Sequence, residues 1–348
     1  MAVKTSAPET MEKARSRRFH WKWVLPLLPW AWFLVRSVHP FLDYVAIGLP
    51  VLLIAGVIAS LLFSLAFRNG FAIIIAASLS VMFLVAVISP MRPSNFASPA
   101  SSVRIATMNL GLSWFSDNDA GFFIFEEQPD LLVGMELAES HHAEFESRFE
   151  FHEADILSLE EQQANEAGLT PVGDTFRRNG LPSIGVYSNL PITVMDDPVV
   201  DQIPGGLPGF RVRVEGDDGP FILYALHIPR PFPGDGAYEL AVSEHFDMVT
   251  AIRDAIEAEE LPVVLAGDLN TVDRGHSYRV FTGSLNDAMR QSGWAVPTSD
   301  RPFPWSLLFA RLDHVLISEE LCAENGESRD TRYADHRPLV VDVGPCDL

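Results

Sequence analysis

Residues 261–270 of this chain read Leu-Pro-Val-Val-Leu-Ala-Gly-Asp-Leu-Asn. The apolar first half, Leu261 to Leu265, is typical of a buried strand, and Gly267 permits a close approach to a ligand at the end of that strand. Asp268 and Asn270 stand two residues apart, so both can face one ligand. The carboxylate can orient or deprotonate a water, and the amide can donate to an anionic oxygen or support a metal. In isolation, the same Asp-x-Asn pair is more typical of an ordinary Asx turn.

Short β-branched runs of the same kind recur from Val103 to the end of the chain. They alternate with loops and amphipathic stretches, which is the pattern of a layered domain that combines strands and helices. Between two of the runs, apolar residues from Leu240 to Ile256 form one helical face, which we expect to cover a sheet. The predicted strands are 103–107, 131–135, 184–187, 210–214, 221–226, 263–266, 315–317 and 339–343.

Polar residues stand where several predicted strands end. Asn109 closes the first strand and Glu136 follows the second. His227 ends a later one, and Arg230 stands three residues further on. A buried carboxylate without a partner is unfavourable, so Glu136 favours a bound cation, while His227 and Arg230 can stabilise phosphoryl charge. The alternatives are a simple turn for Asn109, a capping or solvent-facing position for Glu136, and a structural role for His227.

Two further segments join an aspartate to a histidine beside a predicted strand. They are Arg311-Leu-Asp313-His314 and Tyr333-Ala-Asp335-His336-Arg337-Pro338. Asp313 can fix the tautomer of His336 by accepting a ring N–H. An imidazole oriented in this way can hydrogen-bond a nonbridging phosphate oxygen or take part in proton transfer. Asp335 then stays available for a cation.

In their order along the chain, these fragments resemble the endonuclease/exonuclease/phosphatase superfamily of metal-dependent phosphoesterases. The resemblance covers residues 103–343 and implies an α/β fold, a four-layer α/β sandwich in which helices flank two packed β-sheets. One departure is Leu269, where many members have an aromatic side chain. The signature pieces are Thr107-Met-Asn109, Met135-Glu136, Leu226-His227, Gly267-Asp-Leu-Asn270, Arg311-Leu-Asp313-His314 and Ala334-Asp335-His336-Arg-Pro338.

The resemblance also implies a role for each site residue. Asp268 orients the attacking water, and Asp313 pairs with His336. The implied cofactor is Mg²⁺ or Mn²⁺, with Glu136 as its main ligand. The catalytic set is His227, Asp268, Asn270, Asp313 and His336. The metal-binding set is Glu136, Asn109 and Asp335, and the substrate-binding candidates are Asn109 and Arg230.

The formal net charge of the chain is −21. This charge disfavours a nonspecific nucleic-acid binder, which needs Lys and Arg to replace counterions, although a local basic groove can coexist with it. Cys322 and Cys346 are the two cysteines. We expect them to be unpaired, because two are too few for a disulfide scaffold or a thiolate zinc site. A bridge between them becomes plausible only in an oxidising compartment.

Residues 23–90 are predominantly apolar and predict a transmembrane helical anchor. Tyr44 to Phe67 and Gly70 to Met91 are charge-free runs long enough to cross about 30 Å of hydrocarbon, so both should span. The run from Trp23 to Val35 is shorter and contains two prolines. Basic residues ahead of it favour a cytoplasmic N-terminus, and Arg68 prefers the same side. Three crossings satisfy both preferences and place the following domain outside the cytoplasm, whereas two crossings place it inside.

Four segments follow along the chain: a basic cytoplasmic segment 1–22, an anchor 23–90 of two to three helices, a linker 91–102 and a catalytic domain 103–348. The linker is rich in Pro, Ser and Ala and is predicted to be a tether without structure. The combination is similar to bacterial membrane-anchored members of the superfamily, including those associated with glycopeptide resistance. That similarity implies multi-pass attachment to the inner membrane with an extracytoplasmic catalytic domain.

Site and anchor together predict a membrane-anchored phosphoesterase that hydrolyses a phosphoester by in-line attack of water. Lipid-linked or envelope phosphates are the leading substrates, because an anchor concentrates the enzyme at the bilayer. Two alternatives stay open, namely a nuclease with the same site and a catalytically inactive membrane interaction module. The sequence indicates no obligate protein partner.

Overall fold

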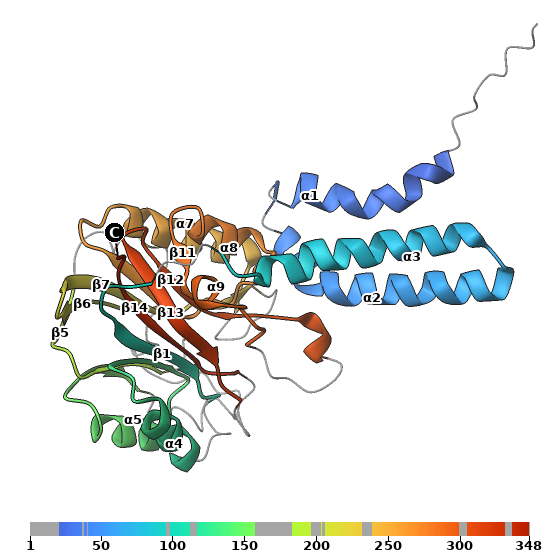
Figure 1. Ribbon diagram of the computed structural model, residues 1–348. Helices are drawn as coiled ribbons and strands as arrows, with labels where there is room; N and C mark the ends of the chain where they lie inside the picture. Colours follow the sequence, from blue (N-terminus) through green and yellow to red (C-terminus); the bar gives the residue numbers. More distant parts are fainter. Residues whose placement is uncertain are drawn as a thin grey trace, which may run out of the picture.

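The computed structural model describes residues 21–36, 38–39, 41–94, 98–111, 117–156, 183–195, 203, 206–231, 239–298, 305–330 and 336–347. They form a layered domain built on two sheets, and an elongated bundle of helices that projects from one end of that domain (Figure 1). The predicted cytoplasmic segment lies outside the described residues except at its last two positions.

Each sheet has six strands. Sheet 1 has the order β13 (Leu321–Ser328), β14 (Leu339–Pro345), β1 (Val103–Asn109), β2 (Leu131–Met135), β4 (Ile184–Ser188) and β3 (Phe151–Asp155). Sheet 2 has the order β11 (Asn286–Asp287), β12 (Asp313–Ile317), β10 (Val263–Asp268), β7 (Gly219–His227), β6 (Gly209–Gly216) and β5 (Ile192–Val194). The pairs β1/β2 and β7/β10 are parallel and the other neighbours are antiparallel. A separate short pair joins β8 (Arg230–Pro231) to β9 (Glu239–Leu240).

Alternate residues of the central strands face the space between the sheets, as the period of two in a strand requires. On β10, Val264 and Ala266 are buried in this inner core, whereas Leu265 faces outward. Helices α7 (Val242–Glu257) and α8 (His276–Phe281) cover the outer face of sheet 2. Helices α4 (Asp117–Glu127) and α5 (Glu139–Glu146) cover the outer face of sheet 1. The expected four-layer α/β sandwich is therefore confirmed.

The eight predicted strands are present, each with ends within two residues of the prediction. The strands that the sequence pattern did not indicate in the two sheets are β3, β5, β11 and β13, which are the four sheet edges. An edge strand pairs on one side alone and tolerates polar residues, so it carries no apolar β-branched run. The short α9 (Ala288–Ser292) packs beside β13, and η6 (Trp305–Leu308) precedes β12.

The projecting bundle contains the predicted anchor. Its first segment is a 3₁₀ helix, η1 (Trp21–Ala31), continued by α1 (Trp32–Val35). Helix α2 (Leu42–Phe67) and helix α3 (Gly70–Phe83) form a hairpin, and a π-helical turn (Leu84–Ile88) and η3 (Ser89–Met91) lead back to the sandwich. The segments Leu42–Phe67 and Gly70–Met91 are long and apolar enough to cross a membrane.

The helices of the predicted anchor pack against the sandwich. One buried cluster joins Ala46 and Leu49 of α2 and Met82 of α3 to Val272 and Ala310 of the sandwich. Residues from the loop after β10, the loop before β12 and helices α2 and α3 therefore share a single core at the junction.

The segment 91–102 differs from the expected free tether. Its described residues are hydrogen-bonded to the sandwich: Ser94 N–H donates to Arg290 O at 2.7 Å, and Ala100 N–H donates to Pro345 O at 2.8 Å. A Pro-, Ser- and Ala-rich segment has no apolar period, so its composition cannot reveal that its backbone is held by other elements.

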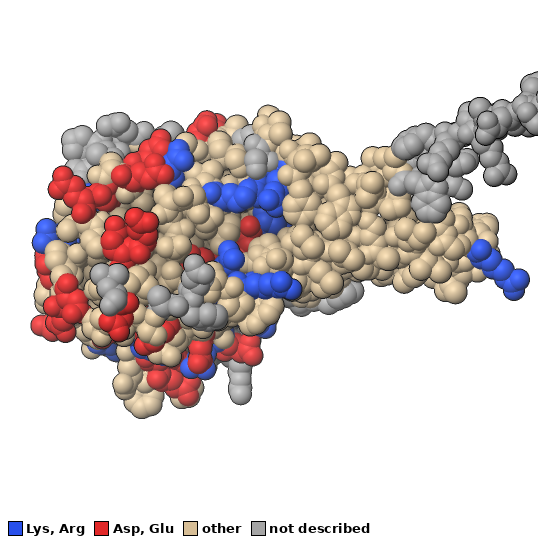
Figure 2. Space-filling view, turned by 45° about the horizontal axis from the view of Figure 1, so that its top comes forward, with Lys and Arg blue, Asp and Glu red and all other residues tan. Residues whose placement is uncertain are grey.

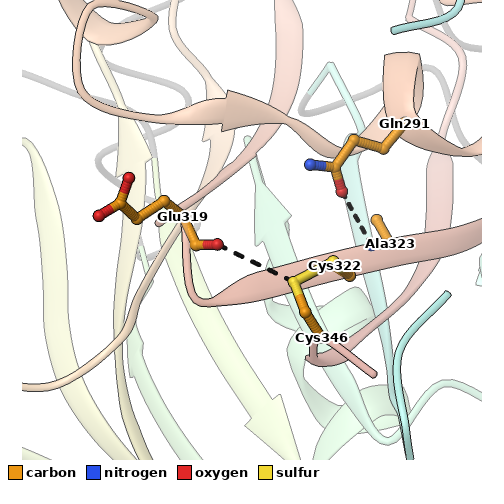
Figure 3. Close-up of a disulfide and its surroundings, with 5 residues drawn as sticks. All are labelled: Gln291, Glu319, Cys322, Ala323 and Cys346. Atoms are coloured by element: carbon orange, nitrogen blue, oxygen red, sulfur yellow. Dashed lines mark hydrogen bonds between the residues drawn. A yellow bond between two sulfur atoms is a disulfide. The ribbon is translucent and has the colours of Figure 1, made fainter. Parts of the chain in front are cut away.

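The two cysteines are paired, which corrects the expectation of unpaired thiols. Cys322 lies on β13 and Cys346 directly follows β14, and a disulfide joins them (Figure 3). Antiparallel pairing of these strands brings the two Cα atoms to 4.9 Å, a separation that suits a disulfide. Their spacing in the sequence cannot show this, because it depends on the pairing of an edge strand that the pattern did not indicate.

Candidate active site

The register of sheet 2 places three candidate residues in one row. His227 at the end of β7 is the pairing partner of Asp268 at the end of β10, and Asp268 is the partner of Asp313 at the start of β12. Partners on neighbouring strands point to the same face of a sheet. Here that face is the inner one, since Ala225 and Ala266, two residues earlier, lie in the core between the sheets. The row therefore closes one end of the inter-sheet core.

Sheet 1 brings two more candidates to the same place. Asn109 ends β1, and Glu136 directly follows β2. The Asn109 amide nitrogen donates to Glu136 Oε1 at 3.1 Å and to Asp268 Oδ2 at 3.2 Å. One amide therefore joins carboxylates that come from opposite sheets.

Two site residues have unusual backbone conformations. The φ angles are 53° at Glu136 and 47° at Asn270, in the left-handed region that residues other than glycine rarely adopt. Such conformations persist where the surrounding structure holds them, and they concentrate at functional sites. The strain at these two positions therefore supports their assignment to the site.

Gly267 has a structural role that differs from the predicted one. Its φ is 140°, and a Cβ at this position would lie 1.9 Å from the carbonyl oxygen of Leu226 on β7. The close approach that requires glycine is thus between two neighbouring strands, beside Asp268, and not between the backbone and a ligand.

His336 and Asp313 form the predicted pair. The Nδ1 atom of His336 lies 2.8 Å from Asp313 Oδ2, and both side chains are buried. Because an ionised carboxylate only accepts hydrogen bonds, this contact places a ring proton on Nδ1. The same Nδ1 lies 3.8 Å from Asp268 Oδ2.

Asp268 stands at the centre of the site and is only 2% exposed. Its Oδ2 lies 3.8 Å from His227 Nε2, and the Asn270 backbone N–H donates to its Oδ1 at 2.9 Å. Burial alone raises the pKa of this carboxyl, but His336, His227 and the hydrogen bonds from Asn270 and Asn109 lower the pKa below its usual range overall. Asp268 is therefore an ionised carboxylate within a low-dielectric site.

Asn270 and Arg230 differ in how closely they join this cluster. The Asn270 amide donates one hydrogen to Ile228 O at 2.9 Å, which ties its loop to the end of β7. An amide carries two such hydrogens, and the second makes no hydrogen bond to the described residues, so it can serve a ligand. Arg230 is half-buried on β8 and makes no hydrogen bond or ion pair with the other candidates in the part of the chain that the structure describes.

The donor set fits a hard divalent cation. Glu136 Oε1 and Asp268 Oδ2 both lie within hydrogen-bond distance of the Asn109 amide nitrogen, and carboxylate oxygen is the ligand that Mg²⁺ and Mn²⁺ prefer. Asp313 uses its Oδ2 for His336, and its buried Oδ1 has no hydrogen-bond partner among the described residues. Asp335, the third predicted metal ligand, lies outside the described residues.

Two residues of the Arg311-Leu-Asp313-His314 piece are structural. The Arg311 side chain is fully buried and its guanidinium bonds Asp273 and Asp287. His314 Nε2 lies 3.0 Å from Thr271 O. Asp273, Asp287 and His314 lie close enough together to hold a metal, but the guanidinium already neutralises their carboxylates. These contacts brace the loop that follows Asp268. Sequence reasoning missed them because the partners Asp273, Asp287 and Thr271 lie outside the signature pieces.

The comparison with sequence families covers the same residues. The profile described as Endonuclease/Exonuclease/phosphatase family matches residues 135–336, more than half of the chain. The chain belongs to the endonuclease/exonuclease/phosphatase family. Members of the endonuclease/exonuclease/phosphatase family are hydrolases that act on phosphoesters. No curated protein matches the chain.

Solved structures similar to this chain include three with low sequence identity. An endonuclease/exonuclease/phosphatase from Beutenbergia cavernae is 20% identical, with a TM-score of 0.46, covering 71% of this chain and 72% of its own. An AP endonuclease from Archaeoglobus fulgidus is 14% identical, with a TM-score of 0.49 and coverages of 71% and 100%. A mannosyl-6-phosphatase from Bacteroides thetaiotaomicron is 15% identical, with a TM-score of 0.45 and coverages of 70% and 99%.

Proposed function

We propose that the protein is a divalent-metal-dependent phosphoesterase in which a water attacks phosphorus in line with the leaving oxygen. The observation that carries this proposal is the setting of Asp268. It is a buried, ionised carboxylate that lies between His227 and His336 and is held by Asn109 from the opposite sheet. A proton acceptor flanked by hydrogen-bond donors suits attack by water on an anionic phosphoester.

Each side chain then has one task. Asp268 accepts a hydrogen bond from the attacking water and orients it. His336, fixed by Asp313, and His227 with Asn270 bind nonbridging phosphate oxygens. Glu136, Asn109 and Asp335 would hold a Mg²⁺ or Mn²⁺ ion, which supplies positive charge that polarises the phosphoryl group. Arg230 is a further candidate for contact with the substrate.

We also propose that the anchor crosses the membrane three times and that the sandwich lies outside the cytoplasm. The start of η1 and the α2–α3 turn, which contains Arg68, lie together at the end away from the sandwich (Figure 1). A 3₁₀ helix rises about 2.0 Å per residue, so η1 and α1 together extend roughly 28 Å, close to the thickness of the hydrocarbon core. The Cys322–Cys346 disulfide supports an oxidising compartment for the sandwich.

A phosphate carried by a lipid is the substrate class that the junction favours. Val272 follows Asn270 by two residues, and Leu312 directly precedes Asp313, and both pack against anchor residues. The catalytic end of the sandwich is thus close to the end that faces the bilayer in this topology.

The distribution of charge points the same way. Figure 2 shows Lys and Arg gathered where the anchor meets the sandwich, and Asp and Glu spread over the sandwich. Two contacts place arginines at this junction: Arg279 donates to Arg36 O at 3.0 Å, and Arg290 donates to Arg92 O at 3.0 Å. Arginine side chains at the junction, next to the membrane surface in this topology, can bind anionic phosphate headgroups.

A nuclease with the same site is the second candidate, since hydrolysis of nucleic-acid phosphodiesters is part of the chemistry of the family. The acidic surface of the sandwich opposes it, because a nucleic acid would meet repulsion away from the junction (Figure 2).

The test is hydrolysis by the full-length protein in nanodiscs, with matched soluble phosphomonoester and phosphodiester, a phospholipid, a polyprenyl phosphate and plasmid DNA. We expect Mg²⁺- or Mn²⁺-dependent turnover that a chelator and Asp268→Asn abolish, with the lipid-borne phosphates preferred. Cleavage of the plasmid in preference to lipids would favour the nuclease. No turnover of any substrate, with no divalent ion bound in calorimetry, would favour the inactive interaction module.

A further inference from the structure

The first turn of α2 is part of the junction with the sandwich and not only a membrane segment. Asp43, the second residue of this helix, is 6% exposed although it is charged. Its carboxylate accepts hydrogen bonds from the backbone N–H groups of His276 and Ser277 and, at 2.7 Å, from the Ser277 hydroxyl. His276 and Ser277 begin α8, where backbone N–H groups have no partner within the helix. The anchor thus supplies the cap of a helix in the catalytic domain.

A second contact joins the same two elements. Pro50 lies inside α2 and has no N–H, so the carbonyl of Ala46, four residues earlier, has no donor within the helix. Arg274 Nε donates to this Ala46 oxygen at 2.5 Å, and its Nη2 donates to Ile47 O at 3.1 Å. Pro50 would weaken an isolated helix. In this protein it leaves the Ala46 carbonyl oxygen available to accept a hydrogen bond from Arg274 of the sandwich.

Arg274 also holds the sandwich side of the junction. Its guanidinium donates to Leu308 O at 2.7 Å and to Phe309 O at 3.0 Å. The residue is 2% exposed, and burial lowers its pKa to about 10, with Asp273 acting in the opposite direction. It therefore stays charged at neutral pH, and loss of its carbonyl partners would leave a buried charge without compensation.

The two contacts lie at the end of one short loop, residues 269–275, which connects the catalytic end of β10 to α8: Arg274 belongs to the loop, and Asp43 contacts the two residues that follow it. The loop follows Asp268 and contains Asn270. At its far end the α2 carbonyls hold Arg274, and Asp43 holds the first residues of α8. Asn270 has a left-handed φ of 47°, a conformation that its surroundings must maintain. Asn270 and Thr271 line one small cavity together with Asp43 and Ile47 of α2.

We propose that helix α2 is a positioning element of the active site, acting through Asp43 and Arg274 on the loop that carries Asn270. This inference rests on the proposed phosphoesterase activity and extends it. The anchor does not merely deliver the enzyme to a bilayer; it also sets the geometry in which Asp268 and Asn270 meet the substrate. Asp43 and Arg274 touch no substrate and are positioning residues.

The experiment compares Asp43→Asn, Asp43→Ala and Arg274→Lys with wild type, as full-length proteins in nanodiscs, on a water-soluble phosphoester. A soluble substrate needs no delivery to the membrane, so a loss of rate reports on the site itself. Displacement of a reacting group by about 1 Å can cost about 100-fold, so we expect kcat to fall about 10- to 100-fold with KM within about twofold. Asp43→Asn keeps one acceptor oxygen and should lose less than Asp43→Ala.

Matched controls lie on the surface of α7, where Arg253 bonds Asp254 in a largely exposed pair. Arg253→Lys and Asp254→Asn repeat the same chemical changes away from the junction and should keep the wild-type kcat. Hydrogen exchange of the amides in 269–275, measured on the folded fraction, should accelerate in the junction variants alone. Hydrogen exchange does not depend on enzyme activity, and it can still be interpreted for a variant whose stability is reduced.

The outcomes separate this inference from the proposed function. If the junction variants keep the wild-type kcat on the soluble phosphoester and the wild-type exchange of 269–275, α2 is an anchor only and the inference is wrong. If the junction variants lose turnover on the lipid substrate but not on the soluble phosphoester, the inference is also wrong. A wild-type protein that hydrolyses no phosphoester overturns the proposed function instead, while the exchange measurement still decides whether α2 orders the loop.

Discussion

Asn109 at the end of β1 donates its amide hydrogen to Asp268 at the end of β10, at 3.2 Å. The two residues belong to different sheets, so this contact forms only when the inner core has brought the sheets together. The candidate active site is therefore formed by packing between the sheets, and neither sheet alone carries all of its residues. The hydrogen bond also helps keep Asp268 ionised.

Asn109→Ala should move the pH dependence of the reaction. The Asn109 hydrogen bond lowers the pKa of Asp268, so its loss raises that pKa, and the acidic limb of the kcat/KM profile should shift to higher pH. Asn325→Ala removes an exposed amide that bonds Asp342 and serves as the control. An unshifted acidic limb would mean that Asp268 is not the group that limits the rate at low pH.

Asp268→Asn should abolish most activity without unfolding the protein. The amide keeps the shape of the carboxylate but is a much weaker proton acceptor, and loss of such a group costs about 10²- to 10⁴-fold in rate. Steady-state kinetics with saturating Mg²⁺ or Mn²⁺ gives the loss in kcat, and circular dichroism confirms the fold. Retention of more than about a tenth of wild-type kcat would remove Asp268 from the role of water acceptor.

Asp313→Asn should impair catalysis through His336. Asp313 Oδ2 accepts the Nδ1–H of His336 at 2.8 Å, and an amide in its place can present an N–H instead, which reverses the favoured tautomer. We expect a fall in kcat of about 100-fold or more. NMR of ¹⁵N-labelled histidine should show the His336 tautomer change; an unchanged tautomer with reduced kcat would point to a different function for Asp313.

Stability should fall in mild acid because of buried imidazoles. Burial lowers the pKa of His245, and burial together with Arg311 lowers the pKa of His314. Between each folded-state pKa and the unfolded value of about 6.5, the unfolded chain binds more protons than the folded chain. As the pH falls through this range, the free energy of unfolding therefore decreases by about 1.4 kcal/mol per pH unit for each such group.

Thermal melting in detergent between pH 7.5 and 5.5 measures this effect. His314→Gln removes one of the two titrating groups while keeping a donor near Thr271 O, so its melting temperature should depend less steeply on pH. An equal slope in wild type and variant would show that His314 does not gain a proton on unfolding in this range.

Reduction of the Cys322–Cys346 disulfide should destabilise the sandwich. A cross-link that closes a loop of this size contributes about 3 kcal/mol in the chain-entropy account. Dithiothreitol should lower the melting temperature of wild type and leave Cys322→Ser/Cys346→Ser unchanged. Maleimide labelling of protein taken from cells, before and after reduction, shows whether the bridge forms in its own compartment; free thiols in unreduced protein would argue for a cytoplasmic sandwich.

The sequence predicted the centre of the sandwich well because the central strands are buried on both faces. Their apolar β-branched runs end where the inner core ends, and the next inward position is occupied by a polar residue such as Asp268 or His227. The same alternation of residues that builds the core therefore marks the site. The alternation of residues cannot show what each site residue does, and those roles came from the resemblance to the family.

The features that sequence reasoning missed depend on contacts between distant residues. The edge strand β13 is partly polar, and the pairing of its Cys322 with Cys346 follows from a register that no local pattern encodes. Asp43 and Ser277 are 234 positions apart. Asp43 and Pro50 of the predicted anchor indicated no partner in the sequence. Their contacts depend on where α8 and Arg274 lie in the folded protein.

The junction between α2 and the sandwich also has a geometric consequence. A catalytic centre that is held by the anchor itself stays at one height above the bilayer, whereas a centre on a free tether samples many heights. If the hairpin inserts into a membrane as proposed, the junction would hold the site at a fixed distance from the membrane plane, and a phosphate would be selected by that distance as well as by its chemistry. The protein would therefore discriminate between lipid substrates by the length of their headgroups.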